Sequence, residues 1–366
     1  MALKCGIVGL PNVGKSTLFN CLSNAKAQSA NFPFCTIEPN VGTISVPDNR
    51  LNQLEGMVNP EKTIPTTIEI VDIAGLVKGA SKGEGLGNKF LANIRETDAI
   101  IHVLRCFDDP NIVHVHETVD PIRDKEIIDF ELQLKDLETV EKQLGSLARA
   151  VKSGDKAVVK QYDFLERLKA ALESGNSART VAPEGEAEEE LSRQLCLLTA
   201  KKVLYLCNVD EASVKNGNDY VEKVKAAVAN ENAEVLVIGT KIESDIAEFE
   251  DHEERQMFLD ELGLEEPGVN RLIRAAYKLL NLQTYFTAGE KEVRAWTVKV
   301  GATAPQAAGV IHTDFEKGFI RAEVMSYDEY VDLGSEQAMK EAGKLRIEGK
   351  DYVVQDGDIM HFRFNV

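Results

Sequence analysis

Short apolar runs separated by polar turns dominate the first third of the chain. An apolar run at residues 4–8 leads into a glycine-containing turn at 9–16, and a mixed apolar and polar stretch follows from residue 17. Apolar runs of this length, bounded by turn residues, are typical of fully buried strands in a parallel sheet. The same pattern recurs at residues 41–45, 66–71, 99–104, 202–207 and 234–238. The sequence therefore predicts an α/β domain built on one such sheet.

A helical period replaces the strand pattern from about residue 128. The apolar residues follow heptad spacing, break at Ser153-Gly154, and resume in the reverse direction. This spacing predicts an antiparallel coiled-coil hairpin. The residues that carry the pattern are Phe130, Leu137, Val140, Leu144, Leu147, Val151, Val158, Leu165, Leu168 and Leu172. We interpret 128–199 as an inserted arm that contacts a partner, the alternative being a self-contained packing element.

The last part of the chain returns to strands. Residues 249–280 read as helices with breaks at Gly263 and Pro267-Gly268. Strand-like runs follow at 292–298, 319–324, 351–354 and 358–364, with a helix at 301–312, an order that predicts a small mixed β-grasp sheet. We therefore expect three domains: a nucleotide-binding domain at 1–127 and 200–280, the arm at 128–199, and a β-grasp domain at 281–366.

Composition narrows the classes of function. The 366 residues carry a net charge of -18, which argues against a protein that coats nucleic acid non-specifically and leaves only a local basic patch to bind RNA. With no apolar run of membrane-spanning length and no export signal, we expect a cytoplasmic protein with no membrane contact. The six cysteines suggest neither a disulfide framework nor a zinc site. Cys35, in a polar loop, is a hypothetical redox-sensitive thiol.

The turn at Gly9–Ser16 has the P-loop spacing G-x-x-x-x-G-K-[ST] between a strand and a helix. Backbone N–H groups in such a turn surround phosphate, the lysine reaches the β and γ phosphates, and the serine hydroxyl binds Mg²⁺. The spacing predicts a nucleoside triphosphate site. The residues expected to bind the nucleotide phosphates are Asn12, Val13, Gly14, Lys15, Ser16 and Thr17.

Two later segments supply the usual γ-phosphate contacts. Thr36, in an irregular loop, is the candidate for Mg²⁺ and the γ-phosphate, and Asp72 and Gly75 end a buried strand as the second metal and phosphate sensor. Small GTPases place a glutamine after this glycine, whereas here the residue is Leu76, so we expect slow hydrolysis or another polar group at the water. His114 or His116, past the strand at 99–104, is the candidate for that group.

The expected base-binding loops depart from the guanine pattern N-K-x-D. The strand at 202–207 ends in Asn208-Val209-Asp210-Glu211, and the last base loop would be Gly239-Thr240-Lys241. A misplaced hydrogen-bonding discriminator loses selectivity by orders of magnitude. The motifs therefore favour ATP, or use of both nucleotides, over GTP alone.

Taken together, these motifs resemble the Obg-like ATPase (YchF) family over essentially the whole chain. The resemblance rests on the P-loop, the run from Asn31 to Asn40, the segment from Asp72 to Leu76, and Asn208 to Glu211. It implies Mg²⁺-dependent ATP hydrolysis, activation by K⁺, and association with the ribosome, through the large subunit or the 70S particle. By the same resemblance Asn12 matches a K⁺ ligand, and His114 matches the group that assists hydrolysis. The C-terminal domain looks like a TGS domain, which implies contact with RNA or with ribosomal protein.

Two other functions fit the sequence. One is a GTP-hydrolysing ribosome-assembly factor, against which the missing lysine at Val209 argues. The other is a scaffold whose arm and C-terminal domain bind partners while nucleotide only stabilises the fold. Nucleotide preference and the effect of Lys15→Ala on ribosome binding distinguish these alternatives.

Overall fold

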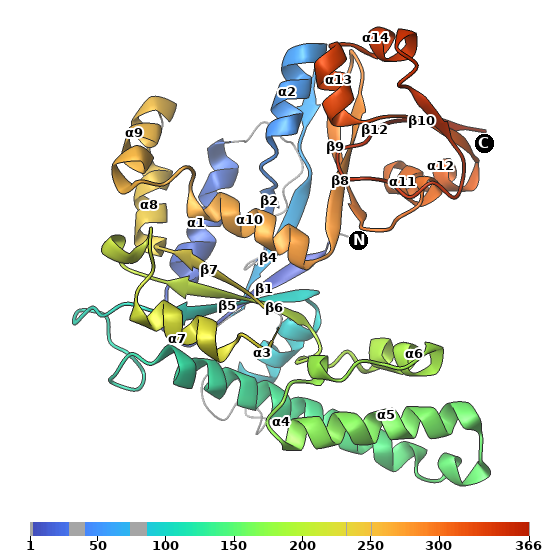
Figure 1. The fold of residues 1–366 in the computed structure, drawn as a ribbon. Helices are drawn as coiled ribbons and strands as arrows, with labels where there is room; N and C mark the ends of the chain where they lie inside the picture. The colour runs from blue at the N-terminus through green and yellow to red at the C-terminus, as the bar shows by residue number, and fades with distance from the viewer. Residues whose placement is uncertain (1–2, 29–40, 74–85, 232, 250, 366) are drawn as a thin grey trace. The chain divides into compact units, whose positions relative to one another are not determined.

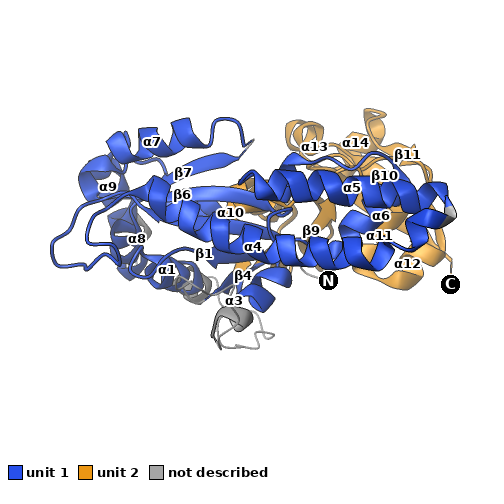
Figure 2. Cartoon of the chain, turned by 90° about the horizontal axis from the view of Figure 1, so that it is seen from below, with its two compact units in different colours: residues 1–43, 69–272 blue, residues 44–68, 273–366 orange. Residues whose placement is uncertain are grey.

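The protein folds into two compact units. The structure, a computed structural model, describes residues 3–28, 41–73, 86–231, 233–249 and 251–365. The first unit comprises residues 1–43 and 69–272, and the second comprises 44–68 and 273–366 (Figure 2). Because the chain passes between the units more than once, neither unit is one continuous stretch of sequence.

The first unit contains the predicted sheet, with strand order β2-β4-β1-β5-β6-β7. The registers among β4, β1, β5, β6 and β7 are parallel, which confirms the α/β fold. The strands are β1 (Lys4–Val8), β2 (Val41–Ser45), β4 (Thr67–Asp72), β5 (Ala99–Arg105), β6 (Lys202–Asn208) and β7 (Glu234–Ile238). Pairing of Ile7 with Asp72 and of Arg105 with Asn208 brings the carboxyl ends of these strands to one edge of the sheet. That edge is where α/β sheets bind ligands.

Helices connect the strands of the first unit (Figure 1). They are α1 (Lys15–Gln28), α3 (Leu86–Arg95), α7 (Asp219–Ala227), α8 (Thr240–Glu248), α9 (His252–Leu262) and α10 (Gly268–Leu279), in which the chain passes to the second unit. Helix α9 ends at Gly263, whose φ of 66° is left-handed and whose N–H bonds back to Leu259 and Asp260. The predicted breaks at Gly263 and Gly268 are therefore confirmed.

The inserted arm is the antiparallel hairpin of α4 (Pro121–Leu147) and α5 (Lys156–Glu173), as Figure 1 shows. A short 3₁₀ turn, η2 (Ala150–Ser153), and Gly154 at φ 76° reverse the chain. The hairpin encloses an apolar core that includes Val140, Leu144, Phe164, Leu165, Leu168 and Leu172, together with residues from η3 (Ala178–Thr180) and α6 (Glu186–Leu195). The antiparallel hairpin predicted from the heptads is confirmed.

Two details of the arm differ from the prediction. Helix α4 begins at Pro121 rather than near 128, because Asp120 accepts hydrogen bonds from the N–H groups of Ile122 and Arg123 and proline fits the first helical position. Phe130, expected in the core, is 58% exposed, since it precedes the part of α4 that packs on α5. At 27 residues α4 is about 40 Å long. None of the described helices is both long enough and apolar enough to cross a lipid bilayer.

The second unit is built on a mixed sheet of order β11-β10-β12-β8-β9-β3. Strand β8 pairs antiparallel with β9 and parallel with β12, which confirms the predicted mixed sheet. Its strands are β3 (Thr63–Ile64), β8 (Leu282–Ala288), β9 (Val293–Lys299), β10 (Phe319–Met325), β11 (Arg346–Glu348) and β12 (Ile359–Phe364). The sequence analysis missed β8, and the strand expected at 351–354 is only a single bridge between Val353 and Thr303.

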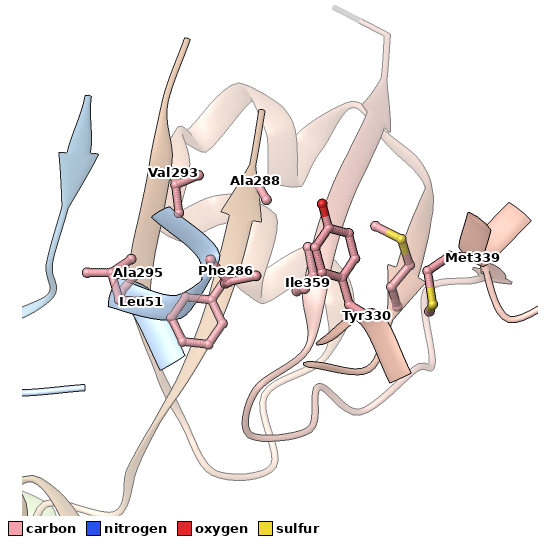
Figure 3. Packing of buried hydrophobic residues seen from close by; sticks show 10 residues of the cluster. Leu51, Phe286, Ala288, Val293, Ala295, Tyr330, Met339 and Ile359 are labelled. Carbon is pink, nitrogen blue, oxygen red and sulfur yellow. The ribbon is translucent and has the colours of Figure 1, made fainter. Parts of the chain in front are cut away.

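Residues 44–68, which the sequence analysis placed in the nucleotide domain, belong to this second unit. Helix α2 (Asn49–Val58) buries Leu51 and Leu54 in one cluster with Phe286, Val293 and Ala295 (Figure 3). Strand β3 adds to the sheet beside β9. Helices α13 (Tyr327–Leu333) and α14 (Glu336–Glu341) contribute to the same cluster, whereas α11 (Ala304–Ile311) and α12 (Thr313–Lys317) pack in a second cluster.

Candidate nucleotide-binding site

The P-loop follows β1 and depends on two glycines. A Cβ at Gly9 would lie 2.6 Å from the carbonyl oxygen of Val103. Gly14 has φ +98°, and a Cβ there would collide with the Asn208 amide. These positions exclude any other residue without a backbone shift. The loop is therefore held against β5 and β6 at the sheet edge.

Lys15 is buried at the start of α1. Its side chain is 7% exposed, and Nζ donates to the Leu10 carbonyl oxygen at 2.6 Å. Burial lowers the pKa of Lys15 to about 8, against the opposing charge of Asp72. Burial likewise raises the pKa of Asp72, and the Lys15 charge opposes that rise. The ammonium group is thus folded back on its own loop and poorly solvated, which favours its transfer to an anionic phosphate.

The oxygen atoms at this edge fit Mg²⁺. The Ser16 hydroxyl is exposed, and the Asp72 carboxylate is half-buried beside β1. Hydroxyl and carboxylate oxygens are the ligands Mg²⁺ prefers, and it usually takes one or two protein ligands with phosphate and water. Among the described residues, no group of three or more His, Cys, Asp or Glu side chains is placed to hold a metal. One hydroxyl and one carboxylate are protein ligands of the kind that Mg²⁺ uses when it binds together with a nucleotide.

Asn208 connects the P-loop to the last base loop. Its side chain is 2% exposed; Nδ2 donates to the Val13 carbonyl at 2.9 Å, and Oδ1 accepts from the Thr240 N–H at 3.0 Å. Thr240 starts α8, with Gly239 before it and the exposed Lys241 after it. Asn208 therefore joins the two loops that are expected to surround the nucleotide.

The two acidic residues after Asn208 have different environments. Asp210 caps the 3₁₀ turn η4 (Glu211–Ser213) by accepting from the Ser213 N–H at 3.0 Å. Glu211 is exposed, and its carboxylate makes no hydrogen bond within the described part of the chain. Val209 is buried, and its N–H donates to Ile238 at 3.0 Å. Of the two carboxylates, Glu211 is therefore the one left for a base.

The sequence analysis missed the residue that shapes the loop after β5. Arg105 is fully buried at the end of that strand and donates to the carbonyl oxygens of Phe107, Asp109 and Ile112 at 2.9–3.2 Å. Its guanidinium also lies 4.7 Å from the Phe107 ring centroid. The available signal was an arginine at the end of a buried strand that is apolar except for His102, since a buried cation needs several acceptors.

Asn12 connects this loop to the P-loop. Its backbone is left-handed, with φ 62°, and its Nδ2 donates to the Val113 carbonyl at 3.1 Å. The amide nitrogen of the Asn12 side chain is therefore hydrogen-bonded. Its Oδ1 accepts no hydrogen bond from the residues that the structure describes. An amide oxygen in this state is a suitable ligand for a hard cation.

His114 is buried and bonded at both ring nitrogens. It is 6% exposed; Nε2 lies 2.8 Å from Oδ2 of Asp124, and Nδ1 accepts from the His116 N–H at 3.1 Å. This arrangement assigns the proton to Nε2, which donates to Asp124 in the first turn of α4. In this conformation neither nitrogen is left for a water molecule. His116 is the more exposed of the two.

Several predicted site residues lie outside the described residues. These are Thr36 and Gly75, expected at the γ-phosphate, together with Leu76 and Cys35. Lys15, Ser16, Asp72, Asn208 and the loop at 239–241 are brought to one edge of the sheet by the strand registers.

Comparison with known proteins agrees with this geometry. A family model described as "50S ribosome-binding GTPase" matches residues 4–143, and the YchF-GTPase_C model, described as "Protein of unknown function (DUF933)", matches 282–365. The chain is 58% identical to the ribosome-binding ATPase YchF of Bacillus subtilis and 57% identical to that of Escherichia coli O157:H7, with both chains covered completely. The chain belongs to the YchF family.

A solved YchF structure shows the same fold throughout. The YchF GTPase of Schizosaccharomyces pombe is 40% identical, with a TM-score of 0.89, and the match covers 99% of this chain and 97% of that chain. A GTP binding protein from Pyrococcus horikoshii OT3, at 18% identity and a TM-score of 0.61, shares the fold. The P-loop α/β fold with its YchF C-terminal domain is thereby confirmed.

Proposed function

We propose that this YchF-family protein is a Mg²⁺-dependent ATPase that prefers ATP to GTP and binds the ribosome under control of its nucleotide. The preference for ATP over GTP rests on the loop after β6, where Val209 is buried and Glu211 is the exposed acid. The names of the full-length relatives, ribosome-binding ATPases, support hydrolysis and the partner.

The phosphates lie against the backbone N–H groups of residues 12–17 in this proposal. Lys15 moves its Nζ from the Leu10 carbonyl to the β and γ phosphates, where its charge offsets the charge that develops during transfer. Ser16 and Asp72, with Thr36, hold Mg²⁺, which neutralises phosphate charge when bound. Thr36 and the Gly75 N–H contact the γ-phosphate and so sense whether it is present.

Base preference follows from residues 208–211. A lysine in the place of Val209 would pack along the nucleotide, and an aspartate in the place of Glu211 would accept from guanine. Buried Val209 cannot extend to the base, and the longer Glu211 accepts from the adenine amino group. Gly239, Thr240 and Lys241 form the opposite wall of the base site.

Asn12 binds K⁺ in this proposal through its unbonded Oδ1, while Nδ2 keeps the hydrogen bond to Val113. A potassium ion there would add positive charge beside the phosphates. We therefore expect hydrolysis to be faster in K⁺ than in Na⁺. Asn12→Ala should remove that difference.

His114 assists hydrolysis in place of the missing glutamine, and intrinsic turnover is slow. Because both ring nitrogens are bonded in the structure, the imidazole must release Asp124 or the His116 N–H before it contacts water. His114→Ala should lower phosphate release and leave ATP binding unchanged. The matched variant His116→Ala should leave both unchanged; loss of release in that variant instead would assign the role to His116.

The arm and the C-terminal domain serve partner binding. We assign nucleotide binding to 1–127 and 200–280, partner contact to the arm at 128–199, and a TGS-type role, including RNA contact, to 281–366. The partner is the ribosome, through its large subunit or the 70S particle, which places the protein in the cytoplasm. Lys15→Ala should remove the difference in ribosome co-sedimentation between ATP and ADP; a difference that persists would favour a scaffold.

The deciding experiment measures calorimetric binding of ATP and GTP in Mg²⁺ and K⁺, together with phosphate release. We expect tighter binding and faster release with ATP. The double variant Val209→Lys, Glu211→Asp restores the guanine pattern and should shift preference toward GTP by about tenfold or more. Asp210→Asn, which keeps the cap, is the matched control and should leave preference unchanged. Tighter binding of GTP by the unmodified protein would overturn the proposal and favour a GTP-hydrolysing assembly factor.

A further inference from the structure

Charge is segregated along the inserted arm. We define the arm tip as residues 142–160, which hold five basic residues and one acidic residue. The rest of the arm, 121–141 and 161–199, holds seven basic and fifteen acidic residues. The arm tip is thus a net positive segment of a protein whose overall charge is -18.

The basic residues also differ in pairing. All seven outside the arm tip form ion pairs with carboxylates: Arg123, Lys125, Lys135, Arg167, Lys169, Arg179 and Arg193. The five at the arm tip are exposed, and their side chains form no ion pair or hydrogen bond with any residue that the structure describes: Lys142, Arg149, Lys152, Lys156 and Lys160. The acid at the arm tip, Asp155, accepts from the Ala157 and Val158 N–H groups as the N-cap of α5.

The hairpin fold brings these cations to one end of the arm. Lys142 lies in the last turns of α4, Arg149 and Lys152 lie at the turn η2, and Lys156 and Lys160 are one turn apart on α5. Buried Leu144 and Leu165 pack the two helices together beneath them. The hairpin therefore gathers five cations at one end of the arm although like charges repel, and a polyanionic ligand would offset that repulsion.

We infer that the arm tip is a surface that binds the phosphate backbone of double-stranded RNA. Four of the five cations are lysines, which bind phosphate as point charges. The arm tip contains no aromatic residue for stacking on unpaired bases, so backbone contact without base readout is the mode it fits. The rest of the arm has eight more acidic than basic residues, fifteen against seven, and this excess of negative charge disfavours contact with RNA outside the arm tip. Naming ribosomal RNA as the natural ligand rests on the function proposed above.

The C-terminal unit offers no comparable array among its described residues. Of its basic group Lys344, Arg346 and Lys350, two members are paired: Lys344 with Glu329, and Arg346 with Glu348 and Asp358. An exposed cation that already has a carboxylate partner contributes less to phosphate binding, because the carboxylate must first be displaced. The unpaired cations therefore favour the arm tip.

The test measures binding of a fluorescent 16-base-pair RNA duplex to the full-length protein by anisotropy, over a series of salt concentrations. The tip variant changes Lys142, Arg149, Lys152, Lys156 and Lys160 to Gln. We expect affinity to fall on the order of 100-fold at about 0.1 M salt. The slope of log affinity against log salt should become shallower by about one unit for each phosphate that the variant no longer neutralises.

The control variant changes five ion-paired basic residues, each at least partly exposed, to Gln: Lys135, Lys169, Arg193, Lys225 and Lys340. It removes the same charge and should retain duplex affinity within about threefold. Equal decreases in affinity for the two variants, or no duplex binding by the unmodified protein, would overturn the inference; so would binding of an acidic peptide in preference to the duplex.

Co-sedimentation of the same proteins with purified ribosomes separates this inference from the proposed function. Failure of the unmodified protein to co-sediment would refute the ribosome as partner, while the duplex measurement would still decide the role of the arm tip. If the ribosome is the partner and the arm tip binds the duplex, the tip variant should fail to co-sediment with ribosomes. It should retain ATP hydrolysis in the absence of ribosomes. Circular dichroism spectra checked against the control variant establish that the arm is still folded.

Discussion

The two ends of the inserted arm use charged residues in opposite ways. At the end near the sheet, Asp124, Lys125 and Asp136 are buried, and each is bonded to neighbouring elements. At the arm tip, the cations are exposed and unpaired among the described residues. Buried charges specify how the helix docks, because each needs one matching partner. Exposed charges add little to folding and remain available for a ligand.

We call the end of the arm next to the sheet the near end. A network of ion pairs and hydrogen bonds around Glu231 connects it to the sheet. Lys125 pairs with Asp129 and Glu231, and Glu231 also accepts from the Tyr205 hydroxyl at 2.6 Å and pairs with Arg179. Burial alone would raise the pKa of Glu231, but hydrogen bonds from Lys125 and Tyr205 lower it overall. The network joins α4, β6 and the segment after α7, so the arm is fixed at its base.

The largest effect should come from Asp136, which is completely buried. It accepts from the N–H groups of Leu198 and Thr199 and from the Thr199 hydroxyl at 2.7–2.8 Å. Asp136→Ala leaves these donors without an acceptor and should lower the free energy of unfolding by about 4 kcal/mol. Urea unfolding followed by circular dichroism measures it. Asp136→Asn keeps one acceptor and should cost about half as much; equal costs would argue against the hydrogen bonds as the cause.

Acid should destabilise the near end through His102, which is buried beside Tyr205. Burial lowers the pKa of His102 from 6.5 to about 4, with Lys125 and Arg179 adding to the effect and Asp129 opposing it. A histidine with a lowered folded-state pKa stabilises fully above pH 6.5, and that contribution is lost as pH falls toward 4. The loss should be about 3 kcal/mol. In the His102→Leu variant, the free energy of unfolding, measured between pH 7 and pH 4, should decrease by correspondingly less than in the unmodified protein.

A smaller effect is expected where the loop after β5 meets α4. Asp124→Ala removes the acceptor of the His114 Nε2–H and should cost about 2 kcal/mol in unfolding. A double-mutant cycle with His114→Ala should give a coupling energy of about 1 kcal/mol. Additive effects would show that the two side chains stabilise the fold independently.

The smallest effect should come from the arm tip. Changing its five cations to Gln removes no ion pair or hydrogen bond among the described residues, so the free energy of unfolding should change by less than about 0.5 kcal/mol. A larger decrease would mean that these side chains support the fold, and it would contradict the contrast between the two ends of the arm.

Sequence patterns located the sheet and the P-loop because both depend on local signals: apolar runs and a fixed glycine spacing. They did not locate Asp136 or Arg105, since the bonds of Asp136 join positions more than sixty residues apart and those of Arg105 depend on the path of a loop. The pattern also treated Asp210 and Glu211 alike, although one caps a 3₁₀ turn and the other is exposed. Partner choice among polar side chains is set by the tertiary fold, so spacing alone does not predict it.

The position of segment 44–68 early in the chain determines the order in which the two units can fold during synthesis. Helix α2 is made early, but the strands that cover Leu51 and Leu54 include β8 and β9, which begin at Leu282 and Val293. At a synthesis rate of about 5–20 residues per second, the apolar face of α2 stays uncovered for roughly 10 to 45 s until β8 and β9 have been made. During this time the first unit can fold only with an unfinished loop between β2 and β4. A nascent chain of this protein thus completes its second unit last, when translation is nearly over.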